Sequence, residues 1–374
     1  MFRISKVQTR KQLRKFILWP EVLYKGCDNW VPPLVGDEFD TLNPKKNAAF
    51  EFCEAQLYLA YDDKDRIVGR VAGIINHKAN RIWKEEVVRF GWFDFIEDVE
   101  VARLLTDTVA QWGREKGCTK IKGPLGFTDM DKEGSLVEGF ENLSPFTCLY
   151  NYPYYDRILK ELGFEKDVDW TQKIADIPDE MPESFKYTDQ ITERFGLSIL
   201  KPRNTRELGR KYGLDIFHLC NESFAELFEF TPLTDTQIKR YLQTYTAILD
   251  PRFVAVCINA EGKPVGFAFC VPSLSKAVKK HRGRLFPFGF VDLLKALHHN
   301  DTIEALMIGV LPEYQGKGAV MLLLKYIHQN CLDMGIHTLI MNPQLENNYK
   351  VQTLFDSYET RPYMRRRCYV KSVD

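Results

Sequence analysis

The 374-residue sequence lacks a net charge, paired cysteines and any long apolar run. Lys plus Arg and Asp plus Glu each total 51, so the formal net charge is zero. Because duplex-binding proteins usually carry a basic excess that neutralises phosphates, this balance argues against a nucleic-acid partner. No apolar run approaches the roughly 18–20 residues that span a bilayer, so we expect no transmembrane segment.

The nine cysteines are scattered singly, and they include no Cys-x-x-Cys pair. In a chain of this length, such cysteines are typical of reduced, buried thiols, which predicts a cytoplasmic protein. The seven histidines show no His-x-x-x-His or His-x-x-Glu spacing, so we predict no metal site. Nothing in the sequence indicates the oligomeric state.

The first nineteen residues carry six Lys or Arg and no acid, a composition that also occurs in transit peptides. The alternative is a short strand containing Phe2, Ile4 and Val7, followed by a helix with Leu13 and Phe16 facing inward. We favour the strand and helix, because the segment continues into ordinary globular sequence without a stretch that resembles a cleavage site.

The length suggests two domains, and the most linker-like region runs from Asp176 to Gly196. We therefore divide the chain into residues 1–180 and 181–374. Each half repeats one order of elements, in which a strand hairpin is followed by strand, helix, strand, helix and strand. The two hairpins share a Val-Gly dipeptide, at Val68-Gly69 and at Val265-Gly266. Strands mixed with helices in this way predict a mixed α/β fold.

The clearest motif joins a predicted strand, Thr302–Val310, to a predicted helix, Ala319–Met334, through a glycine-rich turn. The first N–H groups of a helix lack intrahelical partners, and the helix dipole adds partial positive charge there. Glycines let phosphate oxygens approach the backbone, and Lys317 adds a positive charge. The spacing fits neither the dinucleotide fingerprint nor the Walker loop.

The turn residues Gln315, Gly316, Lys317, Gly318 and Ala319 resemble the pyrophosphate loop, Gln/Arg-x-x-Gly-x-Gly/Ala, of the GNAT superfamily of acyl-CoA N-acyltransferases. Val320 stands where that motif ends in Gly or Ala. The alternative is an ordinary glycine turn before a core helix, and the order of the surrounding elements favours the superfamily. The resemblance covers the whole chain as two GNAT-like halves. It implies, for each half, a mixed, mostly antiparallel sheet with a splayed strand pair and flanking helices.

The same resemblance implies acetyl-CoA or another acyl-CoA as co-substrate, held by the C-terminal half. Beside the loop, it assigns a backbone contact to Val310 and a pantetheine contact to Asn347 or Asn348, although helix capping explains one of these two at least as well.

In the N-terminal half, the acids Glu97, Asp98 and Glu100 replace the glycines. They would repel a pyrophosphate and would suit a helix N-terminus, so we predict one cofactor site and an N-terminal half that shapes the acceptor pocket.

The resemblance also implies that an amine attacks the thioester directly. Glu304 stands where several members carry a glutamate base, and strand alternation predicts that it shares a face with Leu306, Ile308 and Val310. Burial would raise its pKa toward neutrality, which suits a general base. The alternative is a solvent-exposed glutamate at the strand edge.

Many members carry a tyrosine that protonates the departing thiolate, and this chain has Phe355 at that spacing. Tyr349 and Tyr358 are nearby but out of register. Because an ordinary thiol pKa is about 8.5, the thiolate can leave without that acid.

Two further clusters are open to a structural or a binding interpretation. The arginines between Arg361 and Arg367 fit a salt-bridged strand, or an anionic ligand. The aromatic residues between Trp83 and Phe95 fit core packing, or an acyl chain.

Together these features predict an acyl-CoA-dependent N-acyltransferase that moves an acetyl or longer group to a small-molecule or lipid-like amine. One alternative is a non-catalytic acyl-CoA-binding or scaffold protein, which Phe355 and Val320 favour. Another is a long-chain acyltransferase that acts on a lipid-like amine.

Overall fold

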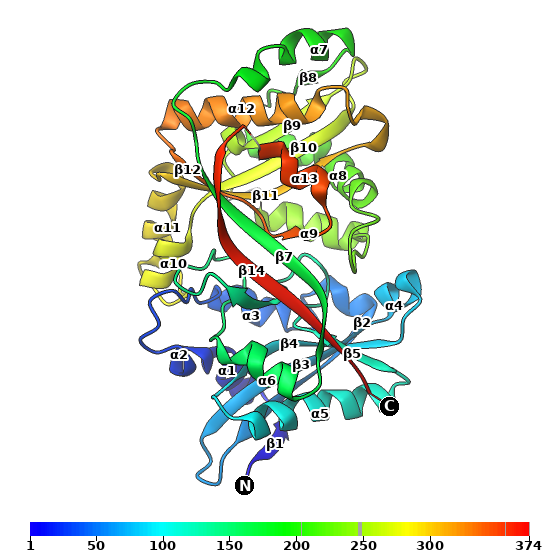
Figure 1. Ribbon diagram of the computed structural model, residues 1–374, viewed down its shortest axis with the longest axis vertical. Coiled ribbons are helices and arrows are strands. Elements are labelled where there is room, and N and C mark those ends of the chain that lie inside the picture. The colour runs from blue at the N-terminus through cyan, green and yellow to red at the C-terminus, as the bar shows by residue number, and fades with distance from the viewer. Residues whose placement is uncertain (203, 246–248, 356, 374) are drawn as a thin grey trace. The chain divides into compact units, whose positions relative to one another are not determined.

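The computed structural model describes residues 1–202, 204–245, 249–355 and 357–373 (Figure 1). The chain divides into two compact units whose residues interleave along the sequence. The first holds Met1–Thr171, Ser275–Val291 and Tyr363–Asp374, and the second holds Gln172–Leu274 and Asp292–Pro362. The division of the repeat at residues 180 and 181 stays a prediction.

The sheet of the first unit is mostly antiparallel, and β4 pairs with β5 in parallel. Its strands follow the order β1 (Arg3–Lys6), β2 (Cys53–Tyr61), β3 (Ile67–Asn76), β4 (Val87–Phe95), β5 (Lys120–Gly123) and the later part of β14 (Glu359–Ser372). The short β6 (Ser135–Glu138) pairs with β14.

Helices cover both faces of this sheet. The helix α5 (Val99–Glu115) buries Val101, Leu105 and Val109, a four-residue spacing that places one apolar stripe against β3 and β4. On the other face, α1 (Arg10–Leu18) buries Phe16 and Ile17. The strand and helix expected for the N-terminal segment are thus confirmed. The further helices are α2 (Pro20–Leu23), α3 (Val35–Thr41), α4 (His77–Trp83), α6 (Tyr154–Glu161) and α10 (Ser275–Lys280), with the 3-10 turn η1 (Ala48–Glu51).

The sheet of the second unit has the same plan, with one parallel pair, β11 and β12, among the antiparallel neighbours that the structure describes. Its order is β8 (Ser198–Ile199), β9 (Val254–Ile258), β10 (Pro264–Pro272), β11 (Thr302–Val310), β12 (Thr338–Ile340) and the last residues of β7 (Glu165–Asp176). The short β13 (Gln344–Leu345) lies outside this order.

Two helices cover the faces of the second sheet. The helix α12 (Ala319–Met334) packs on one face through Leu323 and Ile327, and α8 (Thr205–Ser223) packs on the other through Ile216 and Leu219. The mixed, mostly antiparallel fold with flanking helices is therefore confirmed. The remaining elements are α7 (Thr188–Arg194), α9 (Asp235–Tyr245), α11 (Gly289–His298) and α13 (Tyr349–Gln352), with η2 (Glu183–Phe185), η3 (Pro251–Phe253), η4 (Pro312–Tyr314) and η5 (Thr353–Phe355).

Two sequence-based expectations differ from these elements, and a third agrees with them over the described residues. The predicted linker from Asp176 to Gly196 contains η2 and α7, and Thr188 and Thr192 of α7 are buried. The sequence also favours a helix over Tyr349–Tyr358, whereas the structure forms α13 and η5 there, and residue 356 lies outside its described part. A helix that the sequence favours over Asp235–Ile248 is present as α9, and residues 246–248 lie outside the described part of the chain.

The internal repeat is visible in strand length and register. The strands β4 and β11 each have nine residues. The shared hairpin glycines pair with the last residue of each strand, Gly69 with Phe95 and Gly266 with Val310. The two halves therefore repeat the same strand arrangement residue by residue at this point.

All nine cysteines lie among the described residues, and none forms a disulfide. Eight are buried, and burial raises the pKa of Cys53 to about 12 and that of Cys257 to about 11. Such thiols stay protonated near neutral pH. Within the described residues, no helix combines the length and apolar character needed to cross a bilayer.

Candidate active site

The strands β11 and β12 separate part of the way along their length. They pair from Thr302 opposite Thr338 to Glu304 opposite Ile340, where β12 ends. The strand β11 continues to Val310, so β12 leaves residues 305–310 without a strand partner on that side of the described sheet. The predicted splayed strand pair is present here.

Glu304 lies at the base of this opening. Glu304 is the last residue of β11 that pairs with β12, and only 2% of its surface is exposed. Its Oε1 accepts a hydrogen bond of 2.6 Å from the Ser273 hydroxyl, just past the end of β10. Glu304 is therefore buried, and the alternative of a solvent-exposed edge glutamate is wrong.

A β-bulge changes which side chains share the face of Glu304. Phe269 pairs with Met307 whereas Cys270 pairs with Ala305, so Leu306 is an extra residue in β11. Ile308 and Val310 consequently pack in the core beneath α12, whereas Leu306 packs on the α8 side. The prediction that Glu304 shares one face with Ile308 and Val310 was wrong, because the bulge shifts the alternation by one residue.

The glycine-rich loop enters α12 through two left-handed residues. Gly316 has φ of 75° and Gly318 has φ of 85°, a region that residues with a side chain rarely adopt. Gln315 Nε2 donates to the Val310 carbonyl over 3.3 Å, which ties the loop to the end of β11. The Lys317 ammonium lies over the Tyr314 ring, 5.2 Å from its centroid.

The start of α12 has no side-chain cap among the described residues. Gly318 is the N-cap residue, and the first bond into the helix runs from the Leu322 N–H to the Gly318 carbonyl, at 3.0 Å. The N–H groups that come before that of Leu322, in the first turn of α12, are donors that a helix cannot satisfy internally. With Lys317 beside them, they form a local positive end that suits an anion.

The helix α7 approaches this loop. A Cβ atom on Gly318 would lie 2.9 Å from Ile191 Cγ2, whereas a Cβ on Gly316 would meet no atom within 4 Å. A bulky residue at Gly318 would therefore strain the backbone and displace Ile191. Gly316 is the better position for testing the loop alone.

The two predicted pantetheine residues lie between β13 and α13. Asn347 is exposed, and Asn348 occupies the N-cap position of α13 without a side-chain hydrogen bond to that helix. Side-chain capping therefore explains neither residue among the described contacts. Their predicted role stays open to a ligand.

The aromatic residues at and near the position expected for the general acid are buried in the core. Phe355 is buried, and its ring lies 5.9 Å from that of Tyr358. The Tyr358 hydroxyl makes a 2.8 Å hydrogen bond with His328 Nδ1. Burial raises the pKa of Tyr358 and lowers that of His328, so both side chains are neutral near pH 7.

The arginine cluster is a salt-bridged strand. Arg361 pairs with Asp176 at 2.7 Å, and Arg367 makes two hydrogen bonds to Asp169, at 2.8 and 2.9 Å. Arg366 is buried and donates to the Leu149 carbonyl. These contacts support the structural interpretation of the cluster over that of an anion site.

In the first unit, the start of α5 is occupied by the chain itself. Asp98 is the N-cap residue, and its carboxylate accepts from the Glu100 N–H at 2.8 Å and the Val101 N–H at 3.4 Å. Glu97 pairs with Arg157 at 2.9 Å. Asp98 thus caps this helix as predicted, and its carboxylate occupies the position at which a bound anion would meet the N–H groups of the helix.

Two tyrosines occupy the end of β4 in the same unit. The Phe95 N–H donates to the Tyr155 hydroxyl at 3.1 Å, and the Tyr154 hydroxyl donates to the Phe95 carbonyl at 2.5 Å. Burial raises the pKa of both tyrosines, which keeps the hydroxyls neutral. The backbone of Phe95, the counterpart of Val310, therefore already has hydrogen-bond partners from its own chain.

The counterpart of Glu304 is an arginine. Arg89 is the third residue of β4, as Glu304 is of β11, and each is the last to pair with the parallel neighbour. Arg89 is fully buried, and its Nη1 donates to the Gly126 carbonyl at 3.3 Å. A buried guanidinium cannot accept a proton, so this half lacks a base at that position.

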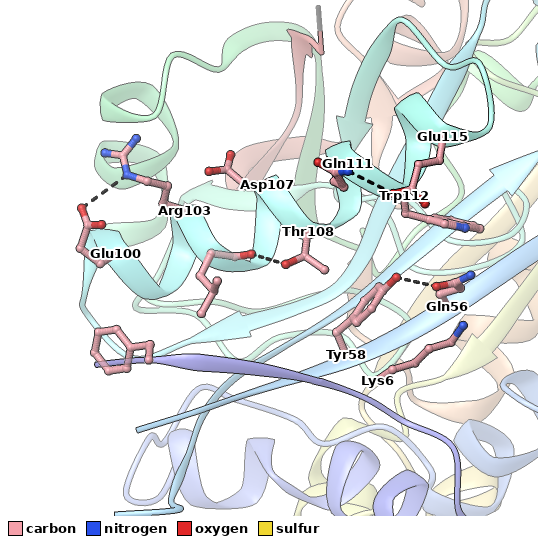
Figure 2. Close-up of a pocket in the computed structure, with 12 residues that line it drawn as sticks. Lys6, Gln56, Tyr58, Glu100, Arg103, Asp107, Thr108, Gln111, Trp112 and Glu115 are labelled. Atoms are coloured by element: carbon pink, nitrogen blue, oxygen red, sulfur yellow. Dashed lines mark hydrogen bonds and ion pairs between the residues drawn. The ribbon is translucent and has the colours of Figure 1, made fainter. Parts of the chain in front are cut away.

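A polar hollow of about 780 Å³ lies beside α5 in the first unit, and Figure 2 shows the residues that line it. Glu100, Arg103, Asp107, Gln111 and Glu115 of α5 line it together with residues of β1 and β2. Several of these side chains bond to one another, such as Arg103 to Glu100. The hollow contains none of the predicted site residues, and its three acids make it unsuited to pyrophosphate.

Sequence reasoning missed Ser273, Arg89 and the two tyrosine hydroxyls. Matching the halves through Val68-Gly69 and Val265-Gly266 does not pair Arg89 with Glu304, because Arg89 lies 20 residues after Gly69 and Glu304 lies 38 residues after Gly266. The contacts of Tyr154 and Tyr155 carry no local signal, because they join residues about sixty positions apart. Among the described residues, no three His, Cys, Asp or Glu side chains group as metal ligands.

Comparisons with known proteins agree with this geometry. Residues 214–356, which include β11, the loop and α12, match the model of the acetyltransferase (GNAT) family. Protein YghO of Escherichia coli strain K12 is 25% identical, over 97% of this chain and 94% of that protein. The bacterial ceramide synthase of Caulobacter vibrioides is also 25% identical, over 99% of this chain and 97% of that protein.

A solved structure has the same tandem arrangement. The tandem GNAT protein from the clavulanic acid biosynthesis pathway matches with a TM-score of 0.58 and 11% identity. The match covers 100% of this chain and 99% of that one. At this identity, the likeness concerns the fold, which is that of two GNAT-like halves.

Proposed function

This chain is an acyltransferase of the GNAT superfamily with two GNAT-like halves, and from that premise we propose that it transfers an acyl group from acyl-CoA to an amine. The single observation that carries the proposal is the difference between the two helix starts. The α12 start has two left-handed glycines and no side-chain cap among the described residues, whereas Asp98 fills the α5 start.

The acyl-CoA would be held by the C-terminal half. Its pyrophosphate would meet the loop Gln315 to Ala319, where the first-turn N–H groups and Lys317 supply positive charge. Its pantetheine arm would run along the end of β11 at Val310, near Asn347 and Asn348. The opening between β11 and β12 supports this path.

The proposed chemistry is direct attack by the amine. The amine nitrogen forms a bond to the thioester carbonyl carbon, the carbon–sulfur bond breaks, and CoA leaves as a thiolate. Glu304 takes the proton that the ammonium must lose before attack, directly or through one water. The second proton, which the nitrogen loses as the amide forms, goes to the departing thiolate through water. Since the ordinary thiol pKa is about 8.5, Phe355 in place of a tyrosine slows departure without preventing it.

We propose that the acceptor is a lipid-like amine and that the transferred acyl group is longer than acetyl. The relative named bacterial ceramide synthase aligns over nearly the whole chain, and a ceramide is an N-acylated long-chain amino alcohol. The nine cysteines, all of them free thiols, support a cytoplasmic location.

Calorimetry with acetyl-CoA and palmitoyl-CoA, followed by thiol release with an amine panel, tests the proposal. The panel contains a water-soluble primary amine and a long-chain amino alcohol. We expect binding of an acyl-CoA, with thiol release that depends on the long-chain amine. Binding of neither thioester would remove the proposal, and tight binding without turnover on any amine would support the non-catalytic acyl-CoA-binding alternative.

A further inference from the structure

Exposed apolar side chains concentrate in one short segment of the chain. Of the fourteen large hydrophobic residues that are exposed in the described chain, six fall between residues 285 and 294. Phe286 is 79% exposed and Phe288 is 70% exposed. We call the five of these that precede residue 292 the apolar tip: Leu285, Phe286, Phe288, Phe290 and Val291.

The apolar tip is a turn followed by the first residues of α11, and residues up to Val291 of that helix belong to the first unit. The Phe290 N–H donates to the Leu285 carbonyl at 2.8 Å, and the Val291 N–H donates to the Phe288 carbonyl at 3.1 Å. A Cβ on the intervening Gly289 would lie 1.9 Å from the Arg284 carbonyl oxygen. The backbone is thus closely packed while the side chains on it point outward.

Contacts within the first unit hold the base of this turn. The Val35 N–H donates to the Gly283 carbonyl at 2.9 Å. Arg284 forms an ion pair of 2.7 Å with Glu21. Because both the turn and its base are fixed, the exposure of the phenylalanines is a property of the folded unit.

The segment that carries the apolar tip is strongly basic. Residues 275–291 contain five Lys or Arg, one His and no Asp or Glu, in a chain whose formal net charge is zero. Lys276, Lys280 and Arg282 are exposed. Apolar and cationic groups therefore lie together on one short stretch.

We propose that the apolar tip inserts into the surface of an anionic lipid bilayer. Aromatic side chains favour the boundary between headgroups and acyl chains, and Lys or Arg next to them are attracted to anionic headgroups. A second copy of this chain is a poorer occupant, because pairing the two tips would bring together two segments that each carry the exposed Lys276, Lys280 and Arg282. The proposal does not depend on acyl transfer, since lipid binding needs neither thioester nor amine.

Vesicle co-sedimentation of the full chain tests this directly. The vesicles are phosphatidylcholine alone, or phosphatidylcholine with phosphatidylglycerol in a two-to-one ratio. We expect binding to the anionic vesicles, weakened by added salt. The double variant Phe286→Ser/Phe288→Ser should weaken that binding by roughly a hundredfold, since two aromatic side chains no longer leave water.

A matched control removes two exposed apolar side chains elsewhere. The variant Ile82→Ser/Leu214→Ser should bind the anionic vesicles as the wild type does, because these residues lie on α4 and α8. The variant Lys276→Glu/Arg282→Glu should weaken binding roughly tenfold.

Three outcomes would overturn the proposal: no wild-type binding to anionic vesicles, unchanged binding by Phe286→Ser/Phe288→Ser, or a wild-type dimer that this variant dissociates. The last outcome would assign the apolar tip to a second copy of the chain.

Discussion

The strands β4 and β11 occupy the same place in the two halves, but the segments that connect them to the next helix differ. Residues 96–98 join β4 to α5, whereas residues 311–318 join β11 to α12. The short connection places the Asp98 carboxylate on the α5 amides, and the long one starts α12 at Gly318 without a side-chain cap in the described chain. One half thus satisfies its helix start internally, and the other leaves it available to a ligand.

The strands β4 and β11 also differ in the residues at their ends and at their third positions. The end of β4 is bonded to Tyr154 and Tyr155, and its third residue is Arg89. The strand β11 ends at Val310 and carries Glu304 as its third residue. The two halves therefore differ in whether a side chain of the chain itself caps the helix start and in whether a carboxylate or a guanidinium is the third residue of the strand.

The largest expected effect is that of replacing the base. Glu304→Gln keeps an acceptor for the Ser273 hydroxyl but removes the basicity, so turnover should fall by roughly two to four orders of magnitude. Acyl-CoA affinity should stay nearly unchanged, and raised pH should restore part of the rate, since more of the amine is then neutral. Steady-state kinetics across pH measure this. The exposed Glu313→Gln is the control, and full turnover of Glu304→Gln near neutral pH would show that Glu304 is not the base.

The next effect concerns the glycine loop. Gly316 and Gly335 lie at the two ends of α12, both with positive φ and with open space for a Cβ. Alanine at either position should lower the free energy of unfolding by about 1 kcal/mol, because of the left-handed backbone. Only Gly316→Ala should also weaken acyl-CoA binding, by about tenfold. Equal affinities of the two variants in calorimetry would remove the phosphate assignment.

A smaller effect is expected at the start of α5. Asp98→Ala removes the carboxylate that accepts from the Glu100 and Val101 amides, so stability to urea should fall by about 1 kcal/mol. It should not create a second cofactor site, because Arg89 and the two tyrosines remain in place. A second bound equivalent of acyl-CoA in this variant would show that Asp98 alone prevents the N-terminal half from binding the cofactor.

The smallest effect is a pH dependence of stability. Because burial lowers the pKa of His328, the unfolded chain binds a proton below about pH 6.5 before the folded chain does. The free energy of unfolding should therefore fall as the pH drops through that range. His328→Asn should flatten the profile measured by urea titration, whereas the exposed His337→Asn should keep it.

The sequence predicted the strand and the helix on either side of the glycine loop well. The bounds Thr302–Val310 and Ala319–Met334 agree with β11 and α12, because β-rich composition, a proline stop and an apolar helix follow one another. The repeat of Val68-Gly69 and Val265-Gly266 was also informative, since both glycines pair with the ends of equivalent strands. These signals are local or periodic.

The remaining features depend on contacts that no local pattern encodes. The bulge at Leu306 arises from register with β10 and reverses the expected face of Ile308 and Val310. The helix α7 lies in a stretch that its prolines and charges mark as a linker, yet its threonines are buried. Tertiary packing decided both cases over local sequence preference.

The stoichiometry of acyl-CoA binding tests the central claim most directly. Isothermal titration of the wild-type chain with acyl-CoA should give one equivalent per chain, and that equivalent should be weakened by Gly316→Ala and unaffected by Gly335→Ala. Two equivalents would contradict the account, because the α5 half would then bind as the α12 half does. No binding would contradict it as well, because the open start of α12 would then have no acyl-CoA to hold.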